Sequence, residues 1–134
     1  MNREIKFRAW LKEDRKMENV KTMDFTDKTI RCLKKNEFIN AYLLRRVSFD
    51  DVELMQYTGL KDKNGKEIYE NDLISCNKHK NIVVFFEGGC FKVKYLRNST
   101  TTITCTLNSF LEKYKCKISG NIYEHPELLE EINW

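Results

Sequence analysis

Apolar and polar side chains alternate along most of this chain with the period of two that is typical of β-strands. In residues 5–10, Ile5, Phe7 and Ala9 share one face of the predicted strand. Further β-rich runs follow at residues 51–57, 82–86, 90–95 and 101–107. Polar and turn-forming residues separate these runs, so the pattern predicts about eight short strands.

Residues 26–48 do not follow this alternation throughout. Residues 29–33 are compatible with a short strand, whereas residues 36–46 favour a helix. In that second segment Asn36 suits the N-cap position and two arginines suit the last turn. Its apolar side chains also recur at helical spacing, at Phe38, Ile39, Tyr42 and Leu43. We therefore predict a helix at residues 36–46.

Two further short helical segments are expected near the C-terminus. Pro126 suits the first position of a helix at residues 126–132. Residues 109–114 suit a single helical turn capped by Asn108 or Ser109. The predicted fold is mainly β: a compact barrel-like or pseudobarrel fold of about eight short strands with one or two short helices. A length of 134 residues without a linker favours one domain, residues 1–134.

The densest turn signals lie in residues 56–74. Asn64 and Gly65 suit a two-residue type I′ hairpin turn, in which both central residues have positive φ. Asp62 precedes them, so its carboxylate can accept a backbone N–H of the turn. A second tight turn follows, with Asn71 in the positive-φ position and Asp72 accepting a backbone N–H.

Three blocks of sequence around these turns belong together. They are residues 3–10 (REIKFRAW), residues 56–74 (with QYTGL, DKNG, IYE and DLI), and residues 120–124 (GNIYE). This set resembles the YopX-like proteins, although Asn71 stands where that family usually has glycine. The resemblance implies an all-β fold and an origin in temperate phages or prophages of Gram-positive bacteria. It implies no catalytic residue.

Charge is distributed unevenly around the formal net value of +4. Residues 77–117 hold eight lysines and arginines against two acidic residues, a balance of +6. Basic side chains interleaved with Phe91 and Tyr95 suggest a surface for nucleic acid. The possible nucleic-acid-binding residues are Lys78, Lys80, Lys92, Lys94 and Arg97. The favoured alternative is that Phe91, Val93 and Tyr95 face the core while the lysines protect a sheet edge.

Neither a metal site nor a cofactor is expected. The five cysteines show no C-x-x-C spacing and the chain has only two histidines, so no zinc pattern is present. A reactive pair of His79 and Cys76 would require the two side chains to meet, and a loop histidine and a strand cysteine are the favoured identities. Free cysteines fit a reducing cytoplasm. The N-terminus resembles no signal peptide, and no apolar run reaches the ~20 residues that a membrane helix needs.

The acidic groups Glu67, Glu70 and Asp72 lack a neighbouring nucleophile, so we expect no catalytic residue and no enzymatic activity. The predicted function is that of a phage accessory protein in the bacterial cytoplasm, which acts by protein–protein contact and forms a homo-oligomer. Host or phage proteins are further partners, with Trp10 or Trp134 as interface anchors. The alternative is a nucleic-acid-binding small barrel, and no membrane partner is expected.

Overall fold

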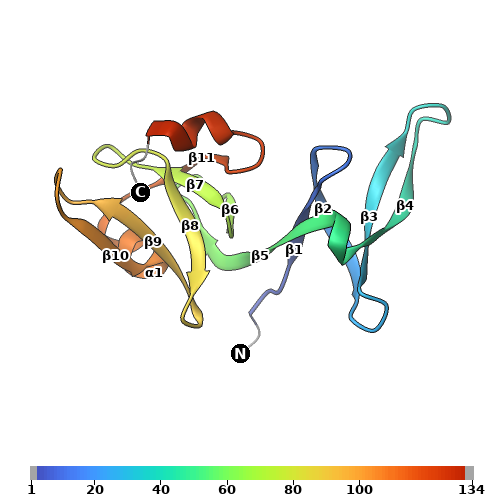
Figure 1. The fold of residues 1–134 in the computed structure, drawn as a ribbon, viewed down its shortest axis with the longest axis horizontal. Coiled ribbons are helices and arrows are strands. Elements are labelled where there is room, and N and C mark those ends of the chain that lie inside the picture. Colours follow the sequence, from blue (N-terminus) through green and yellow to red (C-terminus); the bar gives the residue numbers. More distant parts are fainter. Residues whose placement is uncertain (1–2, 132–134) are drawn as a thin grey trace. The chain divides into compact units, whose positions relative to one another are not determined.

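The structure, a computed structural model, describes residues 3–131 (Figure 1). These residues form eleven strands, one α-helix and two 3₁₀-helical segments, so the prediction of a mainly β fold is confirmed. All strand pairs are antiparallel. One sheet has the strand order β4-β3-β2-β1-β5-β6 and the other has the order β10-β9-β8-β7-β11. Because no closed barrel is seen in these two sheets, the predicted barrel-like arrangement is not confirmed.

Contacts between residues group the chain into two compact units. The N-terminal unit comprises residues 5–56, and the C-terminal unit is formed mainly by residues from Tyr57 onward. The chain passes from one unit to the other within a single strand, β5 (Val52–Lys61). The expectation of one domain over residues 1–134 stays a prediction.

In the N-terminal unit the first four strands form an antiparallel meander, and the fifth pairs with the first. The strands of this unit are β1 (Phe7–Leu11), β2 (Lys16–Asp24), β3 (Thr29–Asn36), β4 (Ala41–Ser48) and the first half of β5, with a 3₁₀ turn, η1 (Phe49–Asp51), before β5. Alternating positions supply its core, as the sequence pattern predicts. The buried residues are Ala9, Leu11, Ile30, Cys32, Val47 and Val52.

The predicted helix at residues 36–46 is wrong, because this segment forms the turn and second strand of the β3–β4 hairpin. Strand pairing runs without a break from Thr29 opposite Ser48 to Asn36 opposite Ala41. The Asn36 side-chain oxygen accepts the N–H groups of Phe38 at 2.9 Å and Ile39 at 3.4 Å. Asn36 thus stabilises a turn instead of capping a helix.

The C-terminal unit contains the remaining strands and the helix. After the second half of β5 come β6 (Glu67–Tyr69), β7 (Asp72–Ser75), β8 (Ile82–Glu87), β9 (Cys90–Leu96), β10 (Thr102–Thr106), α1 (Leu107–Lys113) and β11 (Lys117–Asn121). Its core is separate from that of the N-terminal unit. The buried members are Ile68, Ile74, Ile82, Val84, Val93, Leu107, Phe110 and Cys116.

Both helical segments expected near the C-terminus are present. The N-cap of α1 is Thr106, not Asn108 or Ser109, and its hydroxyl accepts the Ser109 N–H at 3.2 Å. Residues Pro126–Glu131 form a 3₁₀ segment, η2, which begins at Pro126 as predicted. No helix of the described residues has both the length and the apolar character needed to span a bilayer.

The turn after β5 uses a different geometry from the predicted type I′ turn. Only Gly65 of the Asn64–Gly65 pair has positive φ, at 82°. The Asp62 N–H donates to the Lys66 carbonyl at 2.8 Å, which encloses a three-residue loop of the type that ends in a left-handed glycine. The predicted role of Asp62 is confirmed: its Oδ1 accepts the N–H groups of Asn64 and Lys66, both at 2.9 Å.

The second predicted turn is confirmed at both positions. Asn71 has φ of 70°, in the left-handed region that asparagine tolerates better than most residues. Asp72 is 2% exposed, and its Oδ2 accepts the Tyr69 N–H at 2.8 Å. This side-chain contact fixes the sharp reversal between β6 and β7.

Strand β11 contains an irregularity at Gly120. The register of β11 against β7 shifts between Ile118 and Gly120. The His125 ring lies against Gly120, so a Cβ added there would stand 2.6 Å from His125 Nδ1. That same nitrogen accepts the Asn121 N–H at 3.2 Å, which holds the ring in place.

Candidate binding surfaces

One pocket in the C-terminal unit combines cations with aromatic rings. Its volume is about 510 Å³, within the range of roughly 300–1,000 Å³ found for ligand sites. We call it the basic aromatic pocket. Its lining comes from the β7–β8 loop, the end of β9, β10 and the end of α1: Lys78, His79, Tyr95, Arg97, Ile103, Lys113 and Tyr114.

The rings of this pocket form one connected cluster. The His79 ring centroid lies 4.6 Å from that of Tyr95 and 5.1 Å from that of Tyr114. Behind them, buried Phe110 lies 5.1 Å from Tyr95 and 4.8 Å from Tyr114. These separations fall in the range at which aromatic pairs attract one another. Phe110 of α1 therefore anchors the cluster in the core, and the partly buried rings of His79, Tyr95 and Tyr114 line the pocket.

A polar network holds the loop that carries His79. The Cys76 N–H donates to the His79 carbonyl at 2.8 Å, which closes the loop. The Asn81 N–H donates to Ser75 Oγ at 2.8 Å, and Ser119 Oγ donates to Asn81 Oδ1 at 3.0 Å. Because Ser119 belongs to β11, this network ties the β7–β8 loop to a neighbouring strand. The His79 ring is thus held against Tyr95 by both backbone and side-chain contacts.

Burial lowers the pKa of His79 below its ordinary value of 6.5, and the nearby charges of Lys78 and Lys113 lower it further. The ring is consequently neutral at pH 7. A neutral imidazole contributes a flat aromatic surface and no positive charge. The positive charge of the pocket therefore comes from its two lysines and Arg97.

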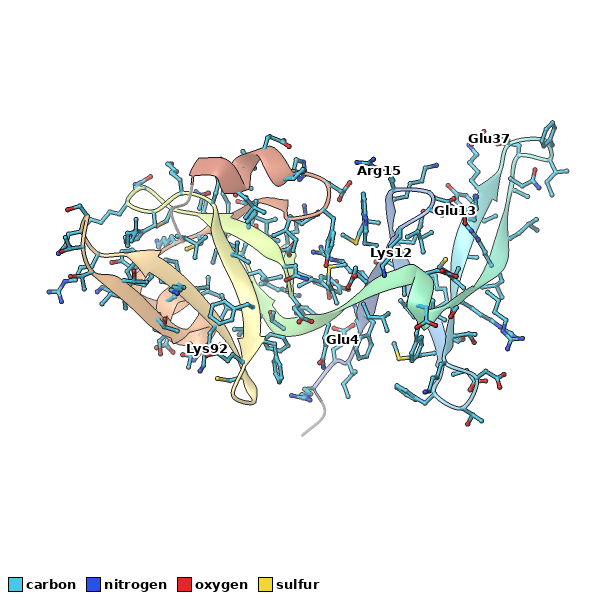
Figure 2. The ribbon with its side chains drawn as sticks, in the orientation of Figure 1. Glu4, Lys12, Glu13, Arg15, Glu37 and Lys92 are labelled. Carbon is cyan, nitrogen blue, oxygen red and sulfur yellow. The ribbon has the colours of Figure 1, made fainter. Side chains whose placement is uncertain are left out.

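Acidic side chains of the described residues do not balance the three cations of this pocket. In residues 3–131, no ion pair joins Lys78, Arg97 or Lys113 to a carboxylate. The Lys113 Nζ instead lies 5.4 Å from the Tyr114 ring centroid. By contrast, the Nζ of Lys92, labelled on β9 in Figure 2, is 3.8 Å from a Glu87 carboxylate oxygen.

The five basic residues proposed for nucleic acid do not form one surface. Lys78 and Arg97 line the basic aromatic pocket, whereas Lys80 is exposed in the β7–β8 loop outside its lining. Strand alternation places Lys92 and Lys94 on the opposite face of β9 from Tyr95. The favoured alternative for β9 is confirmed in its first part, since Phe91, Val93 and Tyr95 all pack against the core. Its second part is wrong: β9 pairs with both β8 and β10, so Lys92 and Lys94 do not lie on a sheet edge.

The N-terminal unit carries an exposed apolar surface on its β3–β4 hairpin, which we call the β3–β4 patch. Phe38 in the turn is 99% exposed, and Figure 2 labels its neighbour Glu37 at the hairpin tip. The other members lie in the turn or in β4: Ile39, Tyr42, Leu43 and Leu44, each between 48% and 66% exposed. Strand alternation places Tyr42 and Leu44 on one face of β4 and Leu43 on the other, and exposed apolar groups gathered on one hairpin in this way are typical of sites of association.

The strand that carries this patch also lies at a sheet edge. Within the described residues, β4 pairs only with β3. The basic residues in its second half are already neutralised. Asp14 accepts hydrogen bonds from Lys34, at 3.1 Å, and from Arg45, while Arg46 pairs with Asp27 at 3.0 Å. These two cations, first Lys34 and then Arg45, lower the pKa of Asp14.

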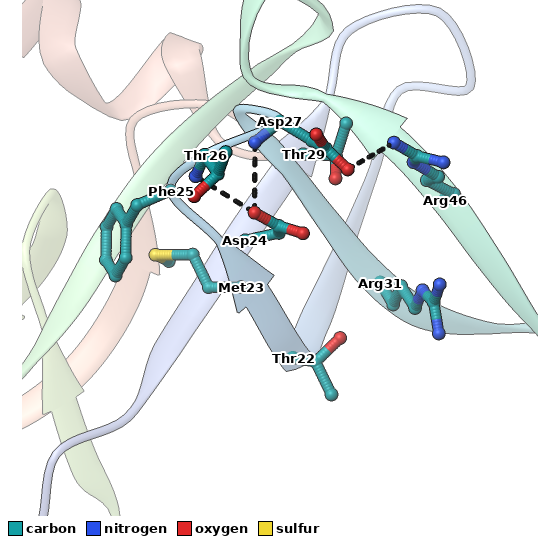
Figure 3. Close-up of a pocket in the computed structure, with 9 residues that line it drawn as sticks. All are labelled: Thr22, Met23, Asp24, Phe25, Thr26, Asp27, Thr29, Arg31 and Arg46. Atoms are coloured by element: carbon teal, nitrogen blue, oxygen red, sulfur yellow. Dashed lines mark hydrogen bonds and ion pairs between the residues drawn. The ribbon is translucent and has the colours of Figure 1, made fainter.

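A second pocket, of about 470 Å³, lies at the β2–β3 turn of the N-terminal unit (Figure 3). Three of its four charged side chains, Asp24, Asp27 and Arg46, already have partners, and the fourth is Arg31. Asp24 Oδ1 accepts the N–H groups of Thr26 and Asp27, both at 2.9 Å, and Arg46 pairs with the Asp27 carboxylate. The positive charge of Arg46 is therefore balanced within the pocket. For this reason a charged ligand is expected in the basic aromatic pocket and not in this one.

Cys76 and His79 have separate environments. The His79 ring lies in the aromatic cluster, while Cys76 packs against the core that contains Cys116. Burial raises the pKa of Cys116 to about 12, and Cys76 contributes to this rise. Among the described residues, no group of three or more metal-ligating side chains comes together. The two proposed tryptophan anchors remain untested: Trp10 is partly buried in β1, and Trp134 lies outside the described residues.

This chain matches a protein family model and a solved structure of similar length. A family model described as YopX protein matches residues 6–130. A solved structure, that of protein EF1440 from Enterococcus faecalis, is 25% identical in sequence and superposes with a TM-score of 0.61. The match covers 96% of this chain and 99% of that one. A search of curated protein sequences finds no match.

Proposed function

Because the chain belongs to the YopX protein family, we propose that it is a non-enzymatic binding module that acts through contacts with other protein chains, first with a second copy of itself. We place this activity in the cytoplasm of a bacterium that carries a phage or prophage. The observation that supports it best is the β3–β4 patch. Its apolar side chains lie in water in the single chain, and a partner chain would remove them from water.

The sequence of β4 is suited to pairing with itself. An antiparallel pair centred on Leu43 places Leu43 opposite its own copy and Tyr42 opposite Leu44. This is the self-complementary contact that a two-fold symmetric dimer requires. The exposed backbone groups of an edge strand supply the hydrogen bonds of such a pair.

Charge does not oppose this arrangement. Arg45 and Arg46 approach the partner strand in the same pairing, but each is bound to a carboxylate of its own chain, Asp14 or Asp27. In a pair centred on Leu43, Arg45 stands opposite Ala41, so no like charges of the two strands face one another directly. The apolar half of β4 can therefore drive association while its basic half stays neutralised.

A charge exchange at the centre of the predicted pair tests the proposal. Leu43→Lys and Leu43→Glu each place two like charges opposite one another in a homodimer, so each should raise its dissociation constant at least about tenfold. Mixing the two variants places lysine opposite glutamate and should restore dimers. Light scattering and sedimentation over a concentration series measure all three samples.

Leu96→Lys is the matched control. Leu96 is 42% exposed, close to the 48% of Leu43, but it lies in β9 of the C-terminal unit. This control should associate as the unaltered chain does. A chain that remains monomeric at high concentration would refute self-association, and association unaffected by either Leu43 variant would refute the β4 interface.

Nucleic-acid binding through residues 77–117 is the second candidate function. It is favoured by one observation: Lys78 and Arg97 meet in a pocket with two tyrosine rings. Cations and exposed rings together are what proteins use to hold single strands. The test is retention of single-stranded oligonucleotides on the protein at low salt, with release as salt is raised.

A further inference from the structure

We propose that the basic aromatic pocket binds one nucleoside phosphate unit, with the base stacked on the Tyr95 and Tyr114 side of the ring cluster and the phosphate held by Lys78, Arg97 and Lys113. This inference rests on the second candidate function and is independent of self-association. The site within the basic segment of residues 77–117 is thereby narrowed to the side chains of one pocket, and its ligand to a nucleoside phosphate.

The phosphate part of the inference follows from the cations. Three of them line one pocket, and none is bound to a carboxylate of the described residues. Arginine offers a planar fork of donors that matches a phosphate, and lysine adds point charges. An anion would therefore complete the charge balance that Asp14 and Asp27 provide for the arginines of β4.

The base part follows from the rings. Tyr95, Tyr114 and His79 are partly buried and packed on Phe110, so their orientations are fixed before a ligand arrives. A fixed ring loses little conformational entropy when a base stacks on it. Stacking on aromatic side chains contributes roughly 1–3 kcal/mol per base in single-strand binding proteins and tolerates any base.

The cations and the aromatic rings of the pocket lie close together in the sequence. Tyr114 follows Lys113 directly in the chain, and Arg97 follows Tyr95 by two residues, at the end of β9. The loop after Arg97 is held by Asn98, whose Oδ1 accepts the N–H groups of Thr100 and Thr101 at 2.9 Å. Lys113 and Arg97 are thus each carried next to a ring of the pocket, so a ligand that has both a phosphate and a base can contact both kinds of group.

Two sources of this ligand exist, a free mononucleotide and a unit of a single strand. Titration with adenosine monophosphate, with an eight-residue oligothymidylate and with inorganic phosphate separates them. Calorimetry gives the affinities, and the His79 ring resonances in an NMR spectrum report whether the ligand enters this pocket. We expect both nucleotides to bind more tightly than inorganic phosphate and to shift the His79 signals.

Matched charge reversals locate the site. Arg97→Glu with Lys113→Glu should weaken oligothymidylate binding at least about a hundredfold, since each substitution replaces a charged hydrogen-bond donor to the phosphate with a carboxylate that repels it. Lys92→Glu with Lys94→Glu reverses the same number of charges on the other face of β9 and should leave binding unchanged. Tyr114→Leu should weaken nucleotide binding about tenfold without affecting inorganic phosphate.

The outcomes distinguish this inference from the function on which it rests. Oligothymidylate binding that depends on Lys92 and Lys94, and not on Arg97 and Lys113, would overturn the pocket and leave nucleic-acid binding standing. Inorganic phosphate binding as tightly as adenosine monophosphate would overturn the stacking contribution and with it the nucleoside class. Absence of binding to all three probes at low salt would remove both the inference and the second candidate function.

Discussion

At the scale of single residues, Asp62 connects parts of the chain that are far apart in sequence. Its Oδ1 holds the turn between β5 and β6, and its Oδ2 accepts the Ile118 N–H of β11 at 3.0 Å. The side chain is 8% exposed. Burial by itself would raise its pKa, but the N–H groups of Ile118, Lys66 and Asn64 outweigh it and lower the pKa below 3.8.

We therefore predict that Asp62→Ala lowers the free energy of unfolding by about 2–3 kcal/mol at pH 7, since three N–H groups lose a charged acceptor. A depressed pKa in the folded state means that the contribution is present above pH 3.8 and is lost as the pH falls through the folded value. The difference between the two proteins should consequently shrink in strong acid. Urea denaturation at pH 7 and below pH 3.8 measures it.

Asp50→Ala is the comparison for this experiment. Asp50 is exposed in η1, and surface substitutions of this kind stay within about 0.5 kcal/mol. An Asp62→Ala protein that is as stable as Asp50→Ala at pH 7, or a difference that does not change with pH, would contradict the assigned role.

The sequence predicts the local half of this arrangement and not the distant half. In the local half, Asp62 and Asp72 accept N–H groups no more than four residues away and Asn71 adopts positive φ, so turn chemistry alone identifies these residues. The bond from Asp62 to Ile118 joins residues 56 positions apart and needs the folded sheet. Asn64 was assigned positive φ because a two-residue turn was assumed, whereas the chain forms a three-residue loop.

At the scale of elements, the β3–β4 hairpin shows how apolar spacing can mislead. Phe38, Ile39, Tyr42 and Leu43 recur at helical intervals, and a helix would place them on one buried face. In the structure all four are exposed, and only Val47 of β4 is buried. The apolar side chains of this segment therefore do not belong to an internal core, so their spacing does not indicate a helix. Their exposure is the reason that a partner surface is proposed for them.

The basic aromatic pocket was only partly visible in the sequence for a related reason. Its lining residues come from segments between position 78 and position 114, and no short motif contains them. The basic composition of residues 77–117 pointed to Lys78 and Arg97. It gave no sign of His79 or Tyr114, since these meet Tyr95 only after α1 has packed beneath β9 and β10.

The cap of α1 gives a test at this scale. We predict that Thr106→Ala lowers the free energy of unfolding by about 1 kcal/mol, because the Ser109 N–H loses its acceptor. Thr106→Ser retains the hydroxyl and should restore most of the stability. Thermal and urea denaturation measure both variants, and equal losses in the two would show that the hydroxyl does not cap the helix.

At the scale of the whole molecule, the described residues have two separate cores joined by one strand. Val52, in the first half of β5, belongs to the core of the N-terminal unit, and Tyr57, in the second half, pairs with Tyr69 of β6. A continuous strand transmits unfolding of either half to its neighbour. For this reason we propose that residues 1–134 unfold as a single domain.

Hydrogen exchange in two core variants tests this cooperativity. Ile30→Ala removes a fully buried side chain of the N-terminal unit, and Leu73→Ala removes one from β7. Each should cost about 2–5 kcal/mol and should lower amide protection equally in both units. Loss of protection confined to the unit that carries the substitution would divide the chain into two domains.

The packing of His125 on Gly120 limits how this chain can diverge. At Gly59, Gly65 and Gly89 a Cβ would meet no atom within 4 Å, so asparagine or aspartate could replace those glycines at modest expense. Any side chain at position 120 would displace an imidazole that is bound to the backbone of β11. Position 125 must therefore change before position 120 can, and the backbone φ of 159° at Gly120 strains any side chain there even after that change.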